Sequence, residues 1–399
     1  AGLATLLGNL GALQPYLAKR HLHQTGTLRY FVPRITALDD LAEAIDRPLE
    51  TADGAIVFVL GSEDKTPEQT AEAVLAATRN LEAPRREMLF FAVPQDTSGL
   101  REALEEVMAW EWVERNTPEL EGDRIARREL AGRQIDARER LNRLCSRCFE
   151  RASSYRTALW VWAGERRTFA SATALSTALS DACDRIYRAA PMIHNELVNR
   201  RSLSSAAAAA RRMLIECMLA HPEEERLGIQ GFPPELSMYL SVLERSGLHH
   251  PVGDRWEFGP GKADDPCRIG PLWAGMAAFL GTTEERPRPV SELFSLLREP
   301  PYGVRDGLLP ILLTAAVLCW GAEVALYENG SFIPQPGIAE FERLIKSPEQ
   351  FAIQRYPLGR ARSWLLTKYS ALIPRLAAQE NPSVLSAVRP LLIFVRQLP

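Results

Sequence analysis

Short apolar runs alternate with amphipathic segments through the first hundred residues. Three runs rich in Val, Ile, Leu and aromatic side chains predict strands at 28–32, 55–60 and 88–93. Between them, apolar residues at helical spacing predict helices at 38–45 and 67–81, and residues 1–25 show the same spacing. The order strand, helix, strand, helix, strand predicts a small parallel sheet covered by helices and preceded by a leading helix.

Helical patterns dominate the next 120 residues. Residues 98–151 combine apolar stripes with many Arg and Glu residues. Opposite charges three and four positions apart are typical of a long solvated helix or a helix pair. An aromatic strand at 159–161 interrupts the helices, which resume at 171–220.

The chain changes character after a break at 228–234. Shorter helical patterns follow at 271–280, 290–298 and 304–320, and two segments have the turn residues of hairpins. One hairpin or extended wing is expected at 253–259, and the other at 325–333 around the turn Glu328-Asn329-Gly330. Three helices followed by a hairpin have the order of a winged helix. The remainder, 338–398, has a helical pattern with interrupting prolines.

These patterns together predict a mostly helical α+β fold in four parts. We expect a small α/β domain with its leading helix at 1–120 and a helical domain at 121–227. A winged-helix-like domain at 228–337 and a C-terminal helical segment at 338–399 complete the chain. Because the chain begins at Ala1 rather than Met and ends in an apolar segment, we expect it to be an internal piece of a larger protein.

Composition narrows the class of protein. The formal net charge is -3, so no strong overall field attracts nucleic acid or an anionic membrane, although a local basic face is compatible with 47 Lys and Arg. Six cysteines spread over 399 residues favour a reducing cytoplasm over a secreted disulfide scaffold. The apolar stretch 308–320 is too short to span a bilayer, so we expect a cytoplasmic protein with no membrane partner.

Local motifs for catalysis or metal binding are weak. The segment 61–66 follows an expected strand as a phosphate-binding loop would, but Asp64 stands where the second glycine is required. Asp96 follows the next strand and loosely resembles a magnesium-binding acid. Cys145 and Cys148 form a lone CxxC on a helical pattern, and the chain offers no second pair of ligands for zinc. We therefore expect no catalytic residues and no metal site in this chain.

Arginines are the candidate contacts for phosphate or partners. Residues 194–201 are unusually polar, which indicates either a local polar junction between helices or an arginine that reaches a phosphate, and we name Arg200, Arg201 and Arg305 as candidates. The third helix of the winged-helix pattern is apolar on all faces, which favours burial over reading DNA. If DNA is bound, we expect its backbone to contact Arg355, Arg360 and Arg362.

Four strings carry a family resemblance. They are Asn-Glu-Leu-Val-Asn-Arg at 195–200, Gly-Phe-Pro-Pro-Glu-Leu-Ser-Met-Tyr at 231–239, Pro-Pro-Tyr-Gly-Val-Arg at 300–305 and Val-Ala-Leu-Tyr-Glu-Asn-Gly-Ser-Phe at 324–332. They resemble the region downstream of the ATPase core in large bacterial P-loop ATPases of the BREX and Pgl phage-defence type. The resemblance extends from about Leu28 to the end of the chain.

The resemblance implies a parent protein that is an AAA-type ATPase acting on DNA within a multiprotein anti-phage system. ATP and magnesium would bind the parent, since the Walker A motif of the family is not in this chain, and no cofactor is expected here. Other defence proteins or further domains of the same chain are the implied partners, and an oligomer is plausible. We therefore expect a non-catalytic coupling or assembly region. The alternatives are a winged-helix DNA-binding module and a stand-alone enzyme whose residues converge only in the fold.

Overall fold

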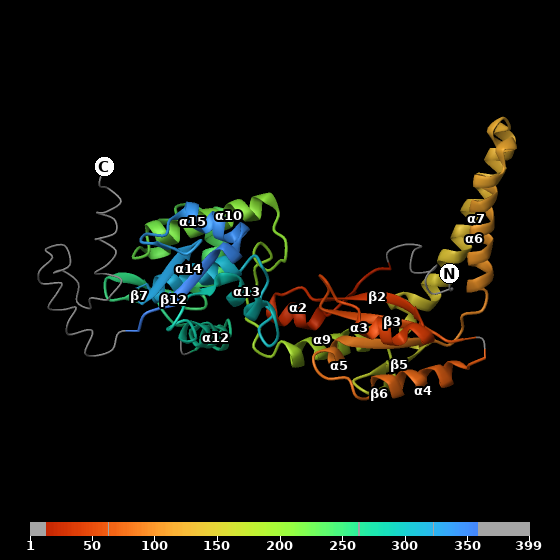
Figure 1. Cartoon of the computed structure of the whole chain (residues 1–399), viewed down its shortest axis with the longest axis horizontal. Helices are drawn as coiled ribbons and strands as arrows, with labels where there is room; N and C mark the ends of the chain where they lie inside the picture. Colours follow the sequence, from red (N-terminus) through yellow and green to blue (C-terminus); the bar gives the residue numbers. More distant parts are fainter. Residues whose placement is uncertain (1–12, 63, 262–263, 322, 358–399) are drawn as a thin grey trace, which may run out of the picture. The chain divides into compact units, whose positions relative to one another are not determined.

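The structure is a computed structural model that describes residues 13–357 except 63, 262, 263 and 322 (Figure 1). The chain divides into two compact units. Unit 1 contains the residues up to Leu22 together with Leu28–Ile186, and unit 2 contains His23–Thr27 together with the residues from Tyr187 onward. Both units mix helices with short sheets, so the predicted mostly helical α+β fold is confirmed.

A six-stranded sheet in the order β1-β2-β3-β4-β5-β6 forms the centre of unit 1. Strands β2, β3 and β4 are parallel, as predicted, and the other pairings are antiparallel. The predicted aromatic strand is β5, and it joins this sheet beside β4. The strands are β1 (Tyr16–Leu17), β2 (Tyr30–Ala37), β3 (Gly54–Leu60), β4 (Leu89–Pro94), β5 (Ala158–Trp162) and β6 (Glu165–Arg167).

Both faces of this sheet are covered, which explains why β3 is buried along its whole length. On one face, α3 (Leu41–Asp46) and α4 (Pro67–Thr78) pack against valines of β3 and β4 in a shared apolar core. On the other face, the Phe58 ring lies 5.1 Å from the Phe149 ring and 6.4 Å from Trp160. The helices α5 (Arg85–Met88), α8 (Arg151–Thr157) and α9 (Ala172–Ile186) complete unit 1.

The expected leading helix is wrong over residues 13–18, none of which is helical. Tyr16–Leu17 forms β1 instead, and α2 begins only at Lys19 and ends at Thr25. The Tyr16 side chain is buried, and its hydroxyl donates a hydrogen bond to the Phe149 carbonyl oxygen at 2.7 Å. This buried anchor, together with pairing to β2, holds the segment in an extended conformation. Residues 1–12 of the expected helix lie outside the described residues.

A helical hairpin extends from the sheet of unit 1 (Figure 1). It consists of α6 (Leu100–Asn116) and α7 (Arg124–Phe149), joined through the short 3-10 helix Pro118–Glu121, and it confirms the predicted charged helix pair. An apolar seam that includes Val107, Leu130 and Leu141 is buried between the helices. Ion pairs cross the hairpin at 3.0 Å and 3.1 Å, from Arg138 to Glu111 and from Arg140 to Glu106. The domain boundary expected at residue 120 falls inside this hairpin.

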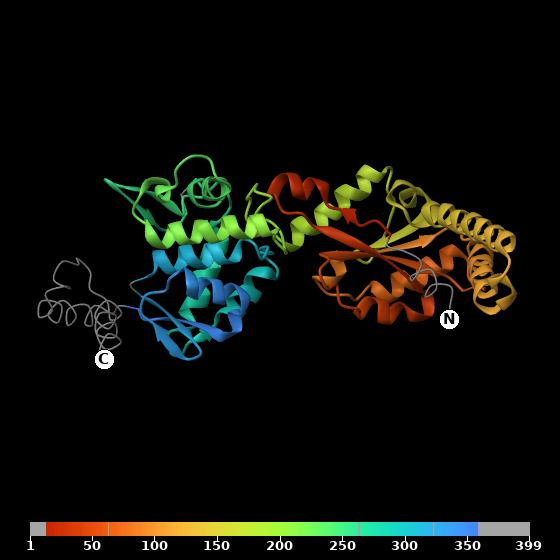
Figure 2. The same ribbon diagram turned by 90° about the horizontal axis from the view of Figure 1, so that it is seen from above.

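The first part of unit 2 packs three helical segments against a two-stranded hairpin (Figure 2). These segments are α10 (Ser205–Ala220), the 3-10 helix Glu225–Gly228 and α11 (Pro234–Met238), which continues into a π-helical turn at Tyr239–Glu244. Ser204 caps α10, because its side chain accepts a hydrogen bond from the Ala207 amide. The hairpin strands are β7 (His249–Val252) and β8 (Arg255–Phe258), so this hairpin starts four residues before the predicted position.

The second part of unit 2 contains the segments expected to form a winged helix, together with β9, α15 and β12. They are α12 (Gly270–Gly281), β9 (Arg288–Pro289), α13 (Val290–Arg298), α14 (Leu309–Cys319), β10 (Val324–Glu328), β11 (Ser331–Ile333), α15 (Ile338–Lys346) and β12 (Phe351–Arg355). The sheet order is β11-β10-β12-β9. The predicted hairpin is confirmed, with Asn329 and Gly330 at φ +48° and +79° in a two-residue turn.

Burial of α14 agrees with its sequence, since Leu309–Val317 is inaccessible to solvent on every face. The prediction of a helical C-terminal segment is correct for α15 but wrong for β12, which pairs with β10 and buries Phe351 and Ile353. Residues 358–399 lie outside the described residues. No helix in the described part of the chain combines the length and the apolar character that crossing a bilayer requires.

Candidate functional site

The chain passes between the two units three times, at residues 22–23, 27–28 and 186–187. The first two passages bound the five residues His23–Thr27, which belong to unit 2 although the sequence on both sides belongs to unit 1. We call residues 19–29 the linking segment. Its polar side chains are held at both ends by unusually buried hydrogen bonds, and these make it the candidate functional site.

Unit 1 holds the start of the linking segment through two acids of α9. Asp181 and Asp184 stand three positions apart, so they lie on the same face of the helix. The Arg20 guanidinium donates to Asp181 Oδ1 at 2.7 Å and to Asp184 Oδ2 at 2.5 Å. Asp184 Oδ1 also lies 2.6 Å from His21 Nδ1. One carboxylate therefore fixes two consecutive side chains of α2.

A buried chain of hydrogen bonds continues from His21 to the sheet. Arg29 Nε donates to His21 Nε2 at 2.9 Å, and Arg29 Nη1 donates to Asp53 Oδ1 at 3.0 Å. Asp53 lies directly before β3, and its second oxygen accepts the Tyr30 amide at 3.2 Å. His21 and Arg29 are each 1% exposed and Asp53 is 3% exposed. We call Asp184, His21, Arg29 and Asp53 the ionic network.

The hydrogen bonds of the ionic network determine the tautomer of His21. An arginine can only donate, so Nε2 of His21 is the acceptor and Nδ1 carries the proton that Asp184 accepts. Burial lowers the pKa of His21, and the neighbouring Arg29 charge lowers it further, while Asp184 opposes both effects. His21 is therefore neutral at neutral pH. Its protonation would place a second positive charge beside Arg29.

Unit 2 holds the middle of the linking segment through residues 193–199. The Ile193 amide donates to the Thr25 carbonyl oxygen at 3.0 Å, and the Thr27 hydroxyl donates to Asn199 Oδ1 at 3.2 Å. The Asn199 side-chain amide donates to the Ile193 carbonyl oxygen at 2.7 Å. We call residues 193–199 the socket, because they hold His23–Thr27 mainly through backbone groups and one buried asparagine.

Gly26 sits where this contact is tightest. Its φ is +72°, a conformation that side-chain-bearing residues rarely adopt. A Cβ placed there would lie 2.2 Å from the Ile193 carbonyl oxygen and 2.9 Å from the His194 Cα. Both clashing atoms are backbone atoms of the socket, so a side-chain rotation cannot relieve them. Glycine is therefore required at this position for the observed packing.

The socket also explains the polar segment that the sequence singles out at 194–201. Asn195 donates to the Ser237 carbonyl oxygen at 3.1 Å and to the Ser241 hydroxyl at 2.9 Å, and its Oδ1 accepts the Leu197 amide at 2.9 Å. Asn195 and Asn199 are 8% and 6% exposed. Of the two interpretations left open by the sequence, the local polar junction matches these contacts of the two asparagines.

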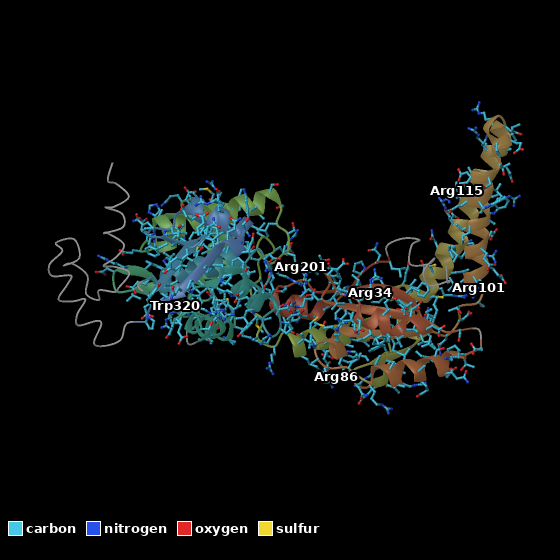
Figure 3. All side chains as sticks on the ribbon, in the orientation of Figure 1. Arg34, Arg86, Arg101, Arg115, Arg201 and Trp320 are labelled. Carbon is cyan, nitrogen blue, oxygen red and sulfur yellow. The ribbon has the colours of Figure 1, made fainter. Side chains whose placement is uncertain are left out.

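The candidate phosphate-contact arginines are placed differently from one another. Arg200 is exposed and lies 3.4 Å from Glu196, four residues earlier in the chain. Arg201 is also exposed, and Figure 3 labels it. The Arg305 side chain is only 6% exposed. The structure therefore presents two of these three arginines to solvent.

The residues expected to contact DNA have protein partners where they are described. Arg355 lies in β12 and bonds Glu323 at 2.8 Å, while Arg360 and Arg362 lie outside the described residues. Glu328 at the tip of the β10–β11 hairpin accepts two hydrogen bonds from Arg343, at 2.6 and 2.9 Å. This pairing lowers the pKa of Glu328. The hairpin tip therefore carries an ionised acid that is bonded to an arginine.

We compared the chain with family models, with curated proteins and with solved structures. Nothing matched in any of the three. The site is therefore interpreted from its own residues.

The segment that follows β3 is used for helix capping. The Thr66 hydroxyl accepts the Gln69 amide at 3.2 Å, and the Gln69 side chain accepts the Thr66 amide at 2.9 Å. This capping box satisfies amides at the N-terminus of α4 that a bound phosphate would otherwise use. Hydrogen bonding to Ser62 lowers the pKa of Asp64 and keeps its negative charge in this loop.

Asp96, which follows β4, also has its carboxylate bonded to neighbouring protein groups. It accepts hydrogen bonds from the Ser98 amide and hydroxyl, which lower its pKa, and it lies 3.0 Å from Arg147. In the nearby CxxC, Cys148 is buried and Cys145 is half-buried. Burial raises the pKa of Cys145 to about 11 and also raises that of Cys148, whose thiol donates to the Asp96 carbonyl oxygen. Among the described residues, no group of His, Cys, Asp and Glu is placed to hold a metal ion.

Sequence reasoning missed the ionic network entirely. A signal was present, because Arg29 interrupts the apolar run expected to form a strand, and a charged side chain there needs a buried partner. Asp53 directly before the most apolar strand is a second such signal. The partners themselves were not readable, since Asp184 is 163 residues from His21 along the chain.

Proposed function

We propose that this chain is a non-catalytic coupling and assembly region of a large ATPase in a bacterial anti-phage defence system. One observation carries the coupling part of the proposal. The ionic network lies within unit 1 and ties together the ends of all three passages of the chain into unit 2. His21 is two residues from the first passage, Arg29 directly follows Leu28 at the second, and Asp184 is two residues before Ile186 at the third.

The proposed mechanism is mechanical. A movement of α9 relative to the sheet would pull on Asp184 and thereby on His21 and Arg29, because one chain of hydrogen bonds, buried from His21 onward, joins them. The buried pair in this chain is Arg29–Asp53, and it resists separation because loss of one partner of a buried pair costs about 3–5 kcal/mol. A strain in unit 1 is therefore passed into the linking segment rather than absorbed locally.

The family strings support the assignment to a defence ATPase. The string at 195–200 supplies Asn195 and Asn199 of the socket, and the string at 300–305 leads to Gly307, whose amide donates to the Arg200 carbonyl oxygen at 3.1 Å. One residue that carries the resemblance, Asn199, thus contacts the linking segment directly, through the Thr27 hydroxyl. In the proposed parent protein, ATP and magnesium bind another part of the molecule, and this region relays their state to partner subunits or to DNA.

A pair of alanine variants in the full-length parent protein tests the proposal. Asp184→Ala removes the bond to His21 and one bond to Arg20, whereas Asp181→Ala removes only a bond to Arg20. Both acids are partly exposed on the same helix, so the second variant is a matched control. The measurements are the rate of ATP hydrolysis by the purified protein and the plating efficiency of phage on cells that express the whole system.

We expect Asp184→Ala to lower protection at least tenfold with ATP hydrolysis within twofold of the unmodified protein, and Asp181→Ala to leave both unchanged. Full protection in the Asp184→Ala variant would refute coupling through the ionic network. Equal loss in both variants would assign the effect to Arg20 instead. A parent protein that does not hydrolyse ATP would refute the assignment to an ATPase.

A further inference from the structure

The helical hairpin of unit 1 exposes large apolar side chains on its outward faces. Trp112 on α6 is 63% exposed and Met108, one turn earlier, is 43% exposed. On α7, Ile125 and Ile135 are 83% and 58% exposed. A single exposed leucine is ordinary on a protein surface, but a tryptophan that is mostly exposed on a rigid helix is typical of an interaction site.

A pocket of about 380 Å³ lies near the free end of the same hairpin. Leu130, Ala131 and Pro118 contribute apolar groups to its mixed lining, and the polar groups come from Glu114, Arg115, Arg127, Thr117 and Gln134. Guanidinium groups beside apolar side chains suit a flat aromatic ring, because arginine stacks on aromatic faces. Figure 3 labels Arg115 toward the free end of the hairpin and Arg101 near its base.

The ring that would fit the pocket is present on the same hairpin. Trp112 stands three positions before Arg115 and therefore lies on the same side of α6 as this edge of the pocket. An exposed ring and a ring-sized pocket on one element are self-complementary. A two-fold interface between identical chains requires this property, since a residue of each copy contacts the matching site of the other.

The charges of the hairpin favour a second copy over nucleic acid. Helix α6 carries five glutamates against two arginines, and α7 carries eight arginines against three acids. When two hairpins cross with α6 of one beside α7 of the other, opposite charges face each other. Phosphate groups that approached Trp112 would instead meet the acid-rich helix, which opposes the binding of a nucleic-acid backbone.

We propose that two copies of this chain associate through the free ends of their hairpins, with Trp112 of each copy in the pocket of the other. Because the contact is confined to the ends of two hairpins, we expect it to bury less than the roughly 1,200–2,000 Å² of a standard stable interface. We therefore expect a reversible association with a dissociation constant on the order of micromolar. This inference does not depend on the coupling proposal, because the hairpin and the ionic network are separate features of unit 1.

Sedimentation velocity of the 399-residue chain over a concentration series tests the inference. We expect a monomer–dimer equilibrium that Trp112→Ala weakens at least tenfold. Phe232→Ala is the matched control, because it removes a 98%-exposed aromatic ring from unit 2 and should leave the equilibrium unchanged. Ala131→Phe keeps Trp112 but fills the pocket that Ala131 lines, so it should weaken the dimer as strongly as Trp112→Ala.

Three results would overturn the inference. The first is a chain that stays monomeric up to about a hundred micromolar, well above the expected constant. The second is a dimer that survives Trp112→Ala or is weakened equally by Phe232→Ala, which would indicate a different or unspecific contact. The third is a dimer lost with Trp112→Ala but intact with Ala131→Phe, which would place the ring outside the pocket. Far-UV circular dichroism of each variant confirms that the surface substitutions leave the helices folded.

Discussion

Removing the charge of Asp53 should destabilise unit 1 more than any comparable change of an exposed carboxylate. Asparagine has nearly the same shape as aspartate and keeps an oxygen that can accept the Tyr30 amide. It leaves Arg29 charged, 1% exposed and without its carboxylate. Loss of one partner of a buried pair costs about 3–5 kcal/mol, because the remaining charge stays desolvated.

The same substitution at the other end of the network provides the comparison. Asp184 has a side chain that is 36% exposed, so water screens its interactions with Arg20 and His21. We expect Asp184→Asn to cost about 1 kcal/mol or less. Added salt should reduce the effect at Asp184 and leave the effect at Asp53 almost unchanged, because salt screens exposed charges much more than buried ones.

Differential scanning calorimetry and hydrogen–deuterium exchange together measure these costs. A loss of 3–5 kcal/mol corresponds to a fall in the melting temperature of unit 1 of roughly 6–20 °C for a domain of this size. Exchange in β2 and β3 should accelerate in the Asp53→Asn variant, while exchange in β10 and β12 of unit 2 serves as the internal reference. Equal, small losses at Asp53 and Asp184 would refute the assignment of a dominant buried pair.

A double variant separates lost charge balance from lost packing. Asp53→Asn combined with Arg29→Met removes the orphaned charge and retains most of the side-chain volume at position 29. The double variant should be at least about 1 kcal/mol more stable than Asp53→Asn alone, since the penalty for an uncompensated buried charge disappears. A double variant whose loss equals or exceeds the two single losses combined would show that the charge of Arg29 is not the cause.

Four further outcomes are expected. Gly26→Ala should destabilise the socket by about 2–5 kcal/mol, because alanine is strained in the left-handed conformation and its Cβ would overpack against Ile193. Hydrogen exchange at 193–199 should become faster, and unchanged exchange would contradict the close approach. Burial lowers the pKa of His21, so below about pH 6.5 the unfolded chain binds a proton that the folded chain does not. Unit 1 should therefore lose stability between pH 7 and 5. A His21→Gln variant whose melting temperature, measured by calorimetry, falls equally steeply over this pH range would refute this. Alkylation of Cys145 at pH 8 should be slow in the folded chain and rapid in denaturant, since the pKa of this thiol is raised to about 11. Equally rapid alkylation of the folded chain, measured by mass spectrometry, would contradict this. Arg355→Ala should change the affinity for duplex DNA by less than twofold in fluorescence anisotropy, because the Arg355 guanidinium is already bonded to Glu323. A larger loss of affinity would indicate that Arg355 contacts phosphate.

The elements that the sequence predicted well are those fixed by local rules. The three parallel strands are continuous apolar runs between turn residues, and the Asn329-Gly330 turn follows from the backbone conformations that these residues tolerate. The long charged helices of the hairpin have their ion pairs at helical spacing, which is also a local property. Burial of α14 followed from its lack of any polar face.

Residues 187–204, expected to lie within the helices at 171–220, form turns and irregular chain instead. Two other errors in secondary structure have tertiary causes. Tyr16 and Leu17 continue a helical pattern, but pairing with β2 and the buried tyrosine hydroxyl outweigh a preference of a few tenths of a kcal/mol per residue, about 0–0.7 for ordinary residues. Phe351–Arg355 becomes a strand because β10 offers it a partner edge 23 or more residues earlier in the chain. Neither partner is visible within a short sequence window.

The candidate site could not be predicted either, because its residues are far apart in the sequence. Each member of the ionic network is an ordinary polar residue in its own neighbourhood, and only the fold assembles them around the passages into unit 2. A stable fold of unit 1 alone would be served as well by apolar residues at Arg29 and Asp53, since buried pairs rarely add net stability. The coupling proposal gives this ionic connection a role, because it would define the position of the linking segment where the chain leaves unit 1. Within unit 2, the close approach of Gly26 and the hydrogen bonds of Asn199 hold the five residues His23–Thr27 against the socket.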